Sequence, residues 1–163
     1  MNQQWTTNLA EDIRQKAHDA AEDYGRSQHQ AEIITAKGAP FFHAFANALE
    51  SNVNEVRHHL QGDVTSSDTL FQTVSRTELK LTRAGFPWFD AHITYQDPNI
   101  VLDYAKGPGC GGDPSLDRKT SNFTFQAAGT DALFLEESFD ENPKRFDTPE
   151  DLARHITELL FRI

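Results

Sequence analysis

From Leu70 onward, apolar and polar residues alternate with a period of two, which restricts this part of the chain to β-strands that bury one face. The clearest stretch is residues 89–104, where two alternating runs flank Asp97-Pro98-Asn99. If this segment closes as a hairpin with Tyr95 opposite Ile100, one face is apolar throughout and carries Phe89, Ala91, Ile93, Tyr95, Ile100, Leu102 and Tyr104. The same register sets His92 opposite Asp103 on the polar face.

The alternation predicts a mainly antiparallel sheet of about five strands over residues 69–139. One strand over residues 70–81 precedes the hairpin, and shorter strands follow around Phe123 and Leu133. A three-residue turn, Ala84-Gly85-Phe86, would pair Leu81 with Phe89 and Leu79 with Ala91, whereas a two-residue turn would set Lys80 and Glu78 against these apolar residues. The longer turn places Glu78, His92 and Asp103 in one row across three strands.

The first third of the chain has helical periodicity. Apolar residues recur at three- and four-residue steps in two runs, which are Leu9, Ile13, Ala17, Ala20 and Tyr24, and then Phe42, Phe45, Leu49, Val53, Val56 and Leu60. Between the runs, Gly38 suits the end of one helix and Pro40 the first turn of the next. The sequence therefore predicts a helical hairpin over residues 1–62.

Thr148 followed by Pro149 predicts the start of a C-terminal helix over residues 148–162, whose apolar face covers the sheet. The expected architecture is one α+β domain spanning residues 1–163.

Composition narrows the range of partners. The net charge is −10 without a basic cluster, which argues against nucleic-acid binding because that affinity rests on Lys and Arg. The N-terminus lacks the pattern of a signal peptide, and no stretch approaches the roughly 18 apolar residues of a membrane span. We therefore expect a cytoplasmic protein that binds neither nucleic acid nor membrane.

The candidate ligand-binding residues are Glu78, His92 and Asp103, because a carboxylate across the ladder can fix the tautomer of an imidazole. The alternative is a solvated ladder of opposite charges. The row contains no second His, so we expect no metal.

Cys110 is the fourth candidate, and it is the only cysteine in the chain. It lies in the glycine-rich segment 106–114, which lacks the Gly-Lys-Ser/Thr of a phosphate-binding loop, and we expect no cofactor. As a nucleophile, Cys110 needs an activating His or cation nearby. The alternative is that the segment is disordered or a plain crossover.

The leading function hypothesis is a non-enzymatic binding or interaction module, forming a homodimer through the N-terminal helices, because their apolar stripes exceed what one small sheet must cover. On this hypothesis, removing residues 1–35 abolishes dimerisation and leaves the sheet folded. The alternative is a small enzyme or ligand-binding protein that uses Glu78, His92 and Asp103 under a lid. A covered polar face is required by this alternative.

Overall fold

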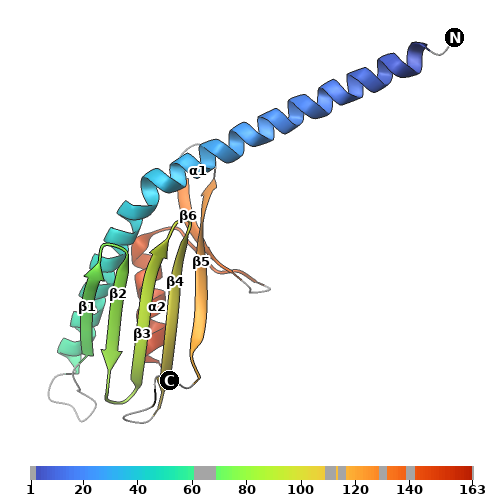
Figure 1. The fold of residues 1–163 in the computed structure, drawn as a ribbon. Helices are drawn as coiled ribbons and strands as arrows, with labels where there is room; N and C mark the ends of the chain where they lie inside the picture. The colour runs from blue at the N-terminus through green and yellow to red at the C-terminus, as the bar shows by residue number, and fades with distance from the viewer. Residues whose placement is uncertain are drawn as a thin grey trace.

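The structure is a computed structural model that describes residues 3–60, 69–108, 113, 117–128, 132–138 and 142–162. Over these residues the fold is α+β, as the sequence predicts, with two helices and a seven-stranded antiparallel sheet. The strands lie side by side in chain order, so the sheet is a simple meander (Figure 1). The elements are α1 (Gln3–His59), β1 (Thr69–Ser75), β2 (Glu78–Arg83), β3 (Trp88–Gln96), β4 (Asn99–Gly107), β5 (Lys119–Ala128), β6 (Ala132–Glu137), β7 (Arg145–Phe146) and α2 (Pro149–Phe161).

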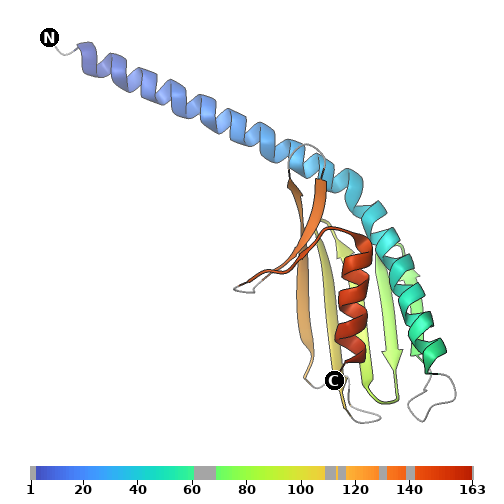
Figure 2. The ribbon, with the colours of Figure 1, turned by 180° about the vertical axis from the view of Figure 1, so that it is seen from behind.

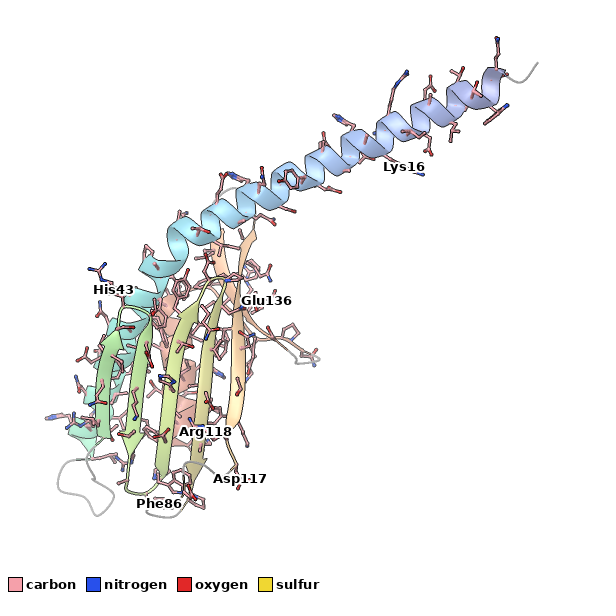
Figure 3. The ribbon with its side chains drawn as sticks, in the orientation of Figure 1. Lys16, His43, Phe86, Asp117, Arg118 and Glu136 are labelled. Atoms are coloured by element: carbon pink, nitrogen blue, oxygen red, sulfur yellow. The ribbon has the colours of Figure 1, made fainter. Side chains whose placement is uncertain are left out.

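The predicted helical hairpin is wrong, because α1 is a single helix of 57 residues that continues through Gly38 and Pro40. Gly38 does not end the helix. It lets the helix approach the sheet, since a Cβ at this position would overlap Tyr95 Oη. Pro40 lies inside the helix, and the helix bends in this region, on the N-terminal side of His43 (Figures 1 and 3). Buried residues before and after Pro40, from Ile33 to Val53, hold both parts against the body.

The expectation of five strands is also wrong. The predicted strand over residues 70–81 is a hairpin of β1 and β2, which turns at Arg76 and Thr77. β7 adds a two-residue strand that pairs with β6. The alternation of apolar and polar residues runs through the turn without interruption, so it gives no signal for the reversal.

The predicted hairpin register of β3 and β4 is confirmed, with Tyr95 opposite Ile100 and His92 opposite Asp103. The register of β2 and β3 differs from the prediction by two residues, because Leu81 pairs with Ala91 and Arg83 with Phe89. A shift of two keeps every side chain on its predicted face, so the burial argument does not distinguish these registers.

The connection between β2 and β3 covers residues 84–87 and is longer than the predicted three-residue turn. The buried Arg83 side chain organises it. Its Nε donates to Pro87 O at 3.1 Å, and its Nη2 donates to Phe86 O at 3.0 Å. A third hydrogen bond, of 3.0 Å, runs from Nη1 to Thr69 Oγ1 in β1.

Both helices cover the same face of the sheet (Figures 1 and 2). The core between them is continuous and includes Phe42, Phe45, Leu49, Leu81, Ile93, Leu102, Phe125, Leu152 and Ile156. The predicted N-cap of α2 is confirmed, since Asp151 N donates to Thr148 Oγ1 at 3.1 Å. At the other end of α2, Lys106 Nζ donates to Leu159 O and Arg162 O.

Candidate functional site

The polar face of the sheet lies opposite the two helices, and within the described part of the chain no helix covers it (Figures 1 and 2). Alternation along the strands places Glu78, His92 and Asp103 on this face. These three residues lie on neighbouring strands, as the sequence predicts. The pairing of His92 with Asp103 is as predicted, and only the position of Glu78 differs from the predicted row.

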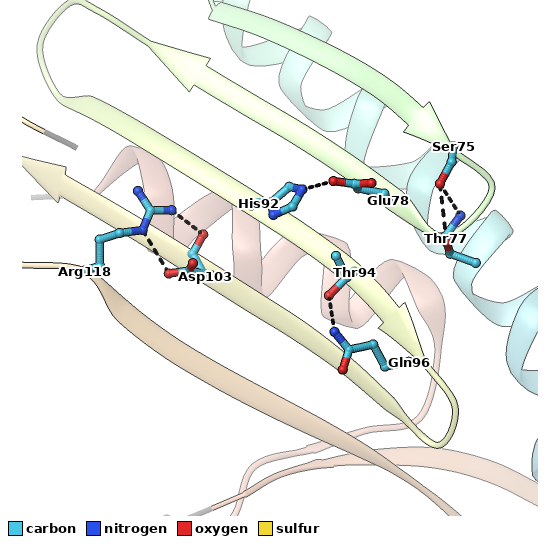
Figure 4. A network of polar contacts seen from close by, with 8 residues as sticks. All are labelled: Ser75, Thr77, Glu78, His92, Thr94, Gln96, Asp103 and Arg118. Carbon is cyan, nitrogen blue, oxygen red and sulfur yellow. Dashed lines mark hydrogen bonds and ion pairs between the residues drawn. The ribbon is translucent and has the colours of Figure 1, made fainter. Parts of the chain in front are cut away.

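Glu78 is not directly opposite His92. The residue opposite His92 on β2 is Lys80, and Glu78 faces Thr94. Glu78 nevertheless reaches His92 diagonally, and its Oε1 contacts the imidazole Nε2 (Figure 4). Diagonal neighbours on adjacent strands lie within reach of long side chains, so the two-residue shift moves the Cα atoms apart without separating the polar groups.

Asp103 lies opposite His92 but is held by Arg118. Arg118 Nε donates to Asp103 Oδ1 at 3.1 Å, and its Nη1 donates to Asp90 Oδ1 at 3.1 Å (Figure 4 shows the Asp103 contact). Burial lowers the pKa of Arg118, but the hydrogen bonds to the two carboxylates and their negative charges together outweigh this effect and raise it. The site is therefore a Glu78–His92 pair beside an Arg118 guanidinium that bridges two aspartates.

Arg118 was missed by the sequence analysis. It follows the glycine-rich segment, directly before β5, so no strand periodicity links it to Asp103. A single arginine after a long connection has no spacing signal that would place it on the polar face.

These side chains border a shallow depression of about 520 Å³, lined by Gln72, Val74, Glu78, Lys80, Asp90, His92 and Arg118. Among the described residues, the lining carries both signs of charge and has no hydroxyl or thiol group. Among the described residues, no cluster of three or more His, Cys, Asp or Glu side chains could hold a metal ion. The arrangement can accept and donate hydrogen bonds to a polar ligand.

Cys110 lies outside the described residues, as do the glycines at 109, 111 and 112. Gly107, the first glycine of this segment, is the last residue of β4. A Cβ at position 107 would meet the indole of Trp88, with Cε2 at 2.9 Å, so this glycine permits packing of the Trp88 ring. Of the four candidate residues, the structure places Glu78, His92 and Asp103 on the polar face of the sheet.

A second candidate surface is the N-terminal part of α1, residues 3–32, which we call the arm. The arm extends away from the sheet (Figures 1 and 2), and Lys16 marks its outer half (Figure 3). Every side chain of the arm except Ala10 is exposed. The exposed side chains include Trp5 at 58%, Leu9 at 49%, Ile13 at 58% and Tyr24 at 65%.

The four large apolar residues of the arm share one helix face with Ala17 and Ala20, because all six recur at three- and four-residue steps. We call this face the arm face. Polar pairs stabilise the helix along the edge of the arm face, for example Lys16 with Asp12 at 3.0 Å and Gln15 with Asp19 at 3.1 Å. Within the described chain, no helix is both long and apolar enough to cross a membrane.

No protein-family model matches this chain, and no curated protein and no solved structure is significantly similar to it.

Proposed function

We propose that this chain is a non-enzymatic interaction module that self-associates through the arm face. The observation that carries the proposal is the exposure of Trp5, Ile13 and Tyr24, each more than half exposed, on one face of a helix that leaves the body. Large apolar patches on a soluble domain mark interaction sites more often than they mark free surface.

The energetics of a free helix support the same proposal. Helices in proteins gain most of their stability from packing of an apolar face, and the exposed arm lacks this contribution. The arm spans 30 residues, or about 45 Å at 1.5 Å per residue. Its ion pairs are solvent-exposed and contribute roughly 0 to 1 kcal/mol each. Burial of the arm face against a partner supplies the missing stabilisation.

The polar face favours the same class of function. A catalytic site needs a concave and partly dry environment, whereas the described residues around His92 form a shallow depression without a covering helix. The side chains of Glu78 and His92 are both about one third exposed or more, at 34% and 39%.

One observation keeps a small-ligand function as the second candidate. Arg118 is fixed by two aspartates next to the Glu78–His92 pair, which gives a mixed-charge site complementary to a zwitterionic or polyhydroxylated ligand. Chemical-shift mapping with a library of such ligands tests this candidate. Changes confined to β2–β4 that are lost in His92→Ala would support it, and a silent polar face would remove it.

Sedimentation velocity of the full chain over a range of concentrations tests the main proposal. We expect a dimer, and we expect Ile13→Asn to raise its dissociation constant at least about tenfold, because a buried Ile side chain contributes roughly 1.5 to 3 kcal/mol. His29→Asn is the matched control. It introduces the same residue on the side of the helix opposite the arm face.

A second variant separates assembly from folding. The buried residues of α1 begin at Ile33, so a chain without residues 1–30 keeps all of them. We expect this variant to be a folded monomer. A full-length chain that stays monomeric at high micromolar concentration would contradict the proposal.

A further inference from the structure

We infer that the partner of the arm is the arm of a second copy running antiparallel to it, with Trp5 of each copy seated in a crevice where the arm of the other copy joins its body. This inference rests on the proposed self-association and specifies its geometry. It follows from the phase of the arm face, the position of the crevice and the order of side chains along the helix.

The arm face continues directly into the face of α1 that contacts the sheet. After Tyr24, the three- and four-residue steps pass through Ser27, Ala31, Ile34 and Gly38, and then reach Phe41, Phe45, Leu49 and Val53 in the core. The body of each protomer therefore lies on the same side of α1 as its own arm face. Figure 1 shows that the arm extends beyond the end of the sheet.

Because the body lies on the same side of α1 as the arm face, a parallel pair of arms is excluded. Two parallel arms with their arm faces in contact would direct both bodies into the space between the two helices, where they would overlap. In an antiparallel pair, each body lies beyond the tip of the other arm, so the two bodies are at opposite ends of the paired helices. The antiparallel arrangement therefore buries both arm faces without a clash.

A crevice of about 360 Å³ lies where the arm meets the body. Ser27, Ala31 and Ile34 line it from the helix, and Asp97 and Pro98 line it from the β3–β4 hairpin. Two hydrogen bonds fix its walls, from Thr35 Oγ1 to Asp97 Oδ2 at 3.3 Å and from Gln30 Nε2 to Ala127 O at 3.4 Å. A second helix laid along the arm face ends at this crevice.

The order of side chains along the arm matches this geometry. Ala17 and Ala20 are at the centre of the arm face, where small residues let two helices approach closely. If Ala17 of one copy lies beside Ala20 of the other, Ile13 meets Tyr24, and Trp5 falls next to Ala31 and Ile34 of the other copy. The large exposed indole of Trp5, at the tip of one arm, is therefore placed at the crevice at the base of the other copy's arm.

Charge along one edge of the arm face agrees with the antiparallel direction. Asp12, Lys16, Asp19, Asp23 and Arg26 follow one another at steps of three and four along this edge. An antiparallel pair brings the same edges of the two copies together. In the register above, Asp12 lies near Arg26 of the other copy, and Lys16 lies between Asp19 and Asp23, so opposite charges meet.

Disulfide cross-linking tests the direction. Ile13→Cys and Tyr24→Cys are made separately in a Cys110→Ser chain, given different tags, mixed and oxidised. We expect disulfides between residue 13 of one variant and residue 24 of the other. Neither variant should cross-link to itself, because 11 residues separate these positions along the helix, or about 16 Å, and a disulfide needs Cα atoms within roughly 7 Å.

Tryptophan fluorescence tests the crevice without placing a cysteine on the arm face. Trp5 emission should shift to shorter wavelength when the dimer forms, and Ala31→Lys should reduce this shift. Residues 5 and 31 of one copy are about 39 Å apart along the helix, so an effect of position 31 on Trp5 must act between copies. Trp88 is a constant background, and Glu11→Lys, on the outer side of the arm, is the matched control.

The outcomes separate the inference from the proposed function. Heterodisulfides with an Ala31-dependent shift of Trp5 support the antiparallel pair. A dimer in which the position-13 variant cross-links to itself, or in which Ala31→Lys leaves Trp5 emission unchanged, overturns the inference and leaves self-association intact. A monomer at all concentrations overturns both.

Discussion

At the scale of single residues, Arg83 links three parts of the fold through its hydrogen bonds to Thr69, Phe86 and Pro87. Arg83 is 3% exposed, so these oxygen atoms take the place of water around its guanidinium. A charged residue in this position stabilises the fold because its hydrogen bonds join the β2–β3 connection to β1.

We therefore expect Arg83→Met to lower the free energy of unfolding by about 2 to 4 kcal/mol, because methionine keeps much of the volume and removes the donors. Equilibrium urea unfolding measures this change. Arg76→Met, in the exposed β1–β2 turn, is the control and should change stability by less than about 0.5 kcal/mol. Similar small effects for both variants would show that the Arg83 hydrogen bonds contribute little.

His155 makes stability depend on pH. His155 lies on α2 and packs against Phe146 of β7 and Phe123 of β5, with ring centroids 5.0 and 6.2 Å away. Burial lowers its pKa below 6.5, and this effect and that of Lys144 outweigh the opposite influence of Glu137 and Glu158. The unfolded chain therefore binds a proton at His155 more readily than the folded chain, and stability falls as the pH drops below about 6.5.

We expect His155→Phe to reduce the loss of stability between pH 7.5 and pH 5. Urea unfolding at the two pH values measures the difference for the variant and the parent. His43→Phe makes the same substitution at an exposed position of α1 and provides the matched comparison. An unchanged difference in His155→Phe would contradict the role of burial.

At the scale of elements, the two glycines of α1 have opposite surroundings. Nothing lies within 4 Å of a Cβ built at Gly25, whereas a Cβ at Gly38 would overlap the hydroxyl of Tyr95 and lie 3.1 Å from its Cζ. Glycine weakens a helix at both positions, but only at Gly38 does the packing require it.

Gly25→Ala should therefore raise helicity and stabilise the arm by up to about 1 kcal/mol. Gly38→Ala should lower the free energy of unfolding, because Tyr95, which stacks on Phe42 at 5.7 Å, must move. Circular dichroism at 222 nm and urea unfolding distinguish the two effects. Equal stabilisation by both substitutions would show that Tyr95 adjusts freely.

The same elements show which features the sequence could predict. Local signals predicted the N-cap of α2 and the β3–β4 register, since Thr148 and the Asp97-Pro98-Asn99 turn determine both within a few residues. The continuity of α1 through Pro40 depends on packing against distant strands, which no local pattern contains. In the candidate site, the alternation predicted the face of His92 and Asp103. It did not predict that Arg118 holds Asp103.

At the scale of the whole molecule, the core and the arm face lie on one uninterrupted helix. In the proposed dimer, unfolding of the body and dissociation of the arms are linked, because burial of the arm face would stabilise the same helix that packs on the sheet. We expect the melting temperature to rise with protein concentration in the full chain and to be independent of concentration in the chain without residues 1–30. Scanning calorimetry at several concentrations measures this dependence, and a constant melting temperature in the full chain would contradict the linkage.

Because α1 is continuous, the direction in which the arm face points depends on the number of residues between the arm face and the body. Each residue inserted into an α-helix turns everything beyond it by about 100° and moves it by about 1.5 Å. Two residues added after Gln28 would rotate the arm face by about 200°, away from the crevice, although every side chain and every strand stayed the same. A chain with a flexible linker at this point would tolerate such an insertion. In α1 the helix is continuous between Tyr24 and Ile34. In the proposed dimer, the number of residues in this segment is therefore as constrained as their identity.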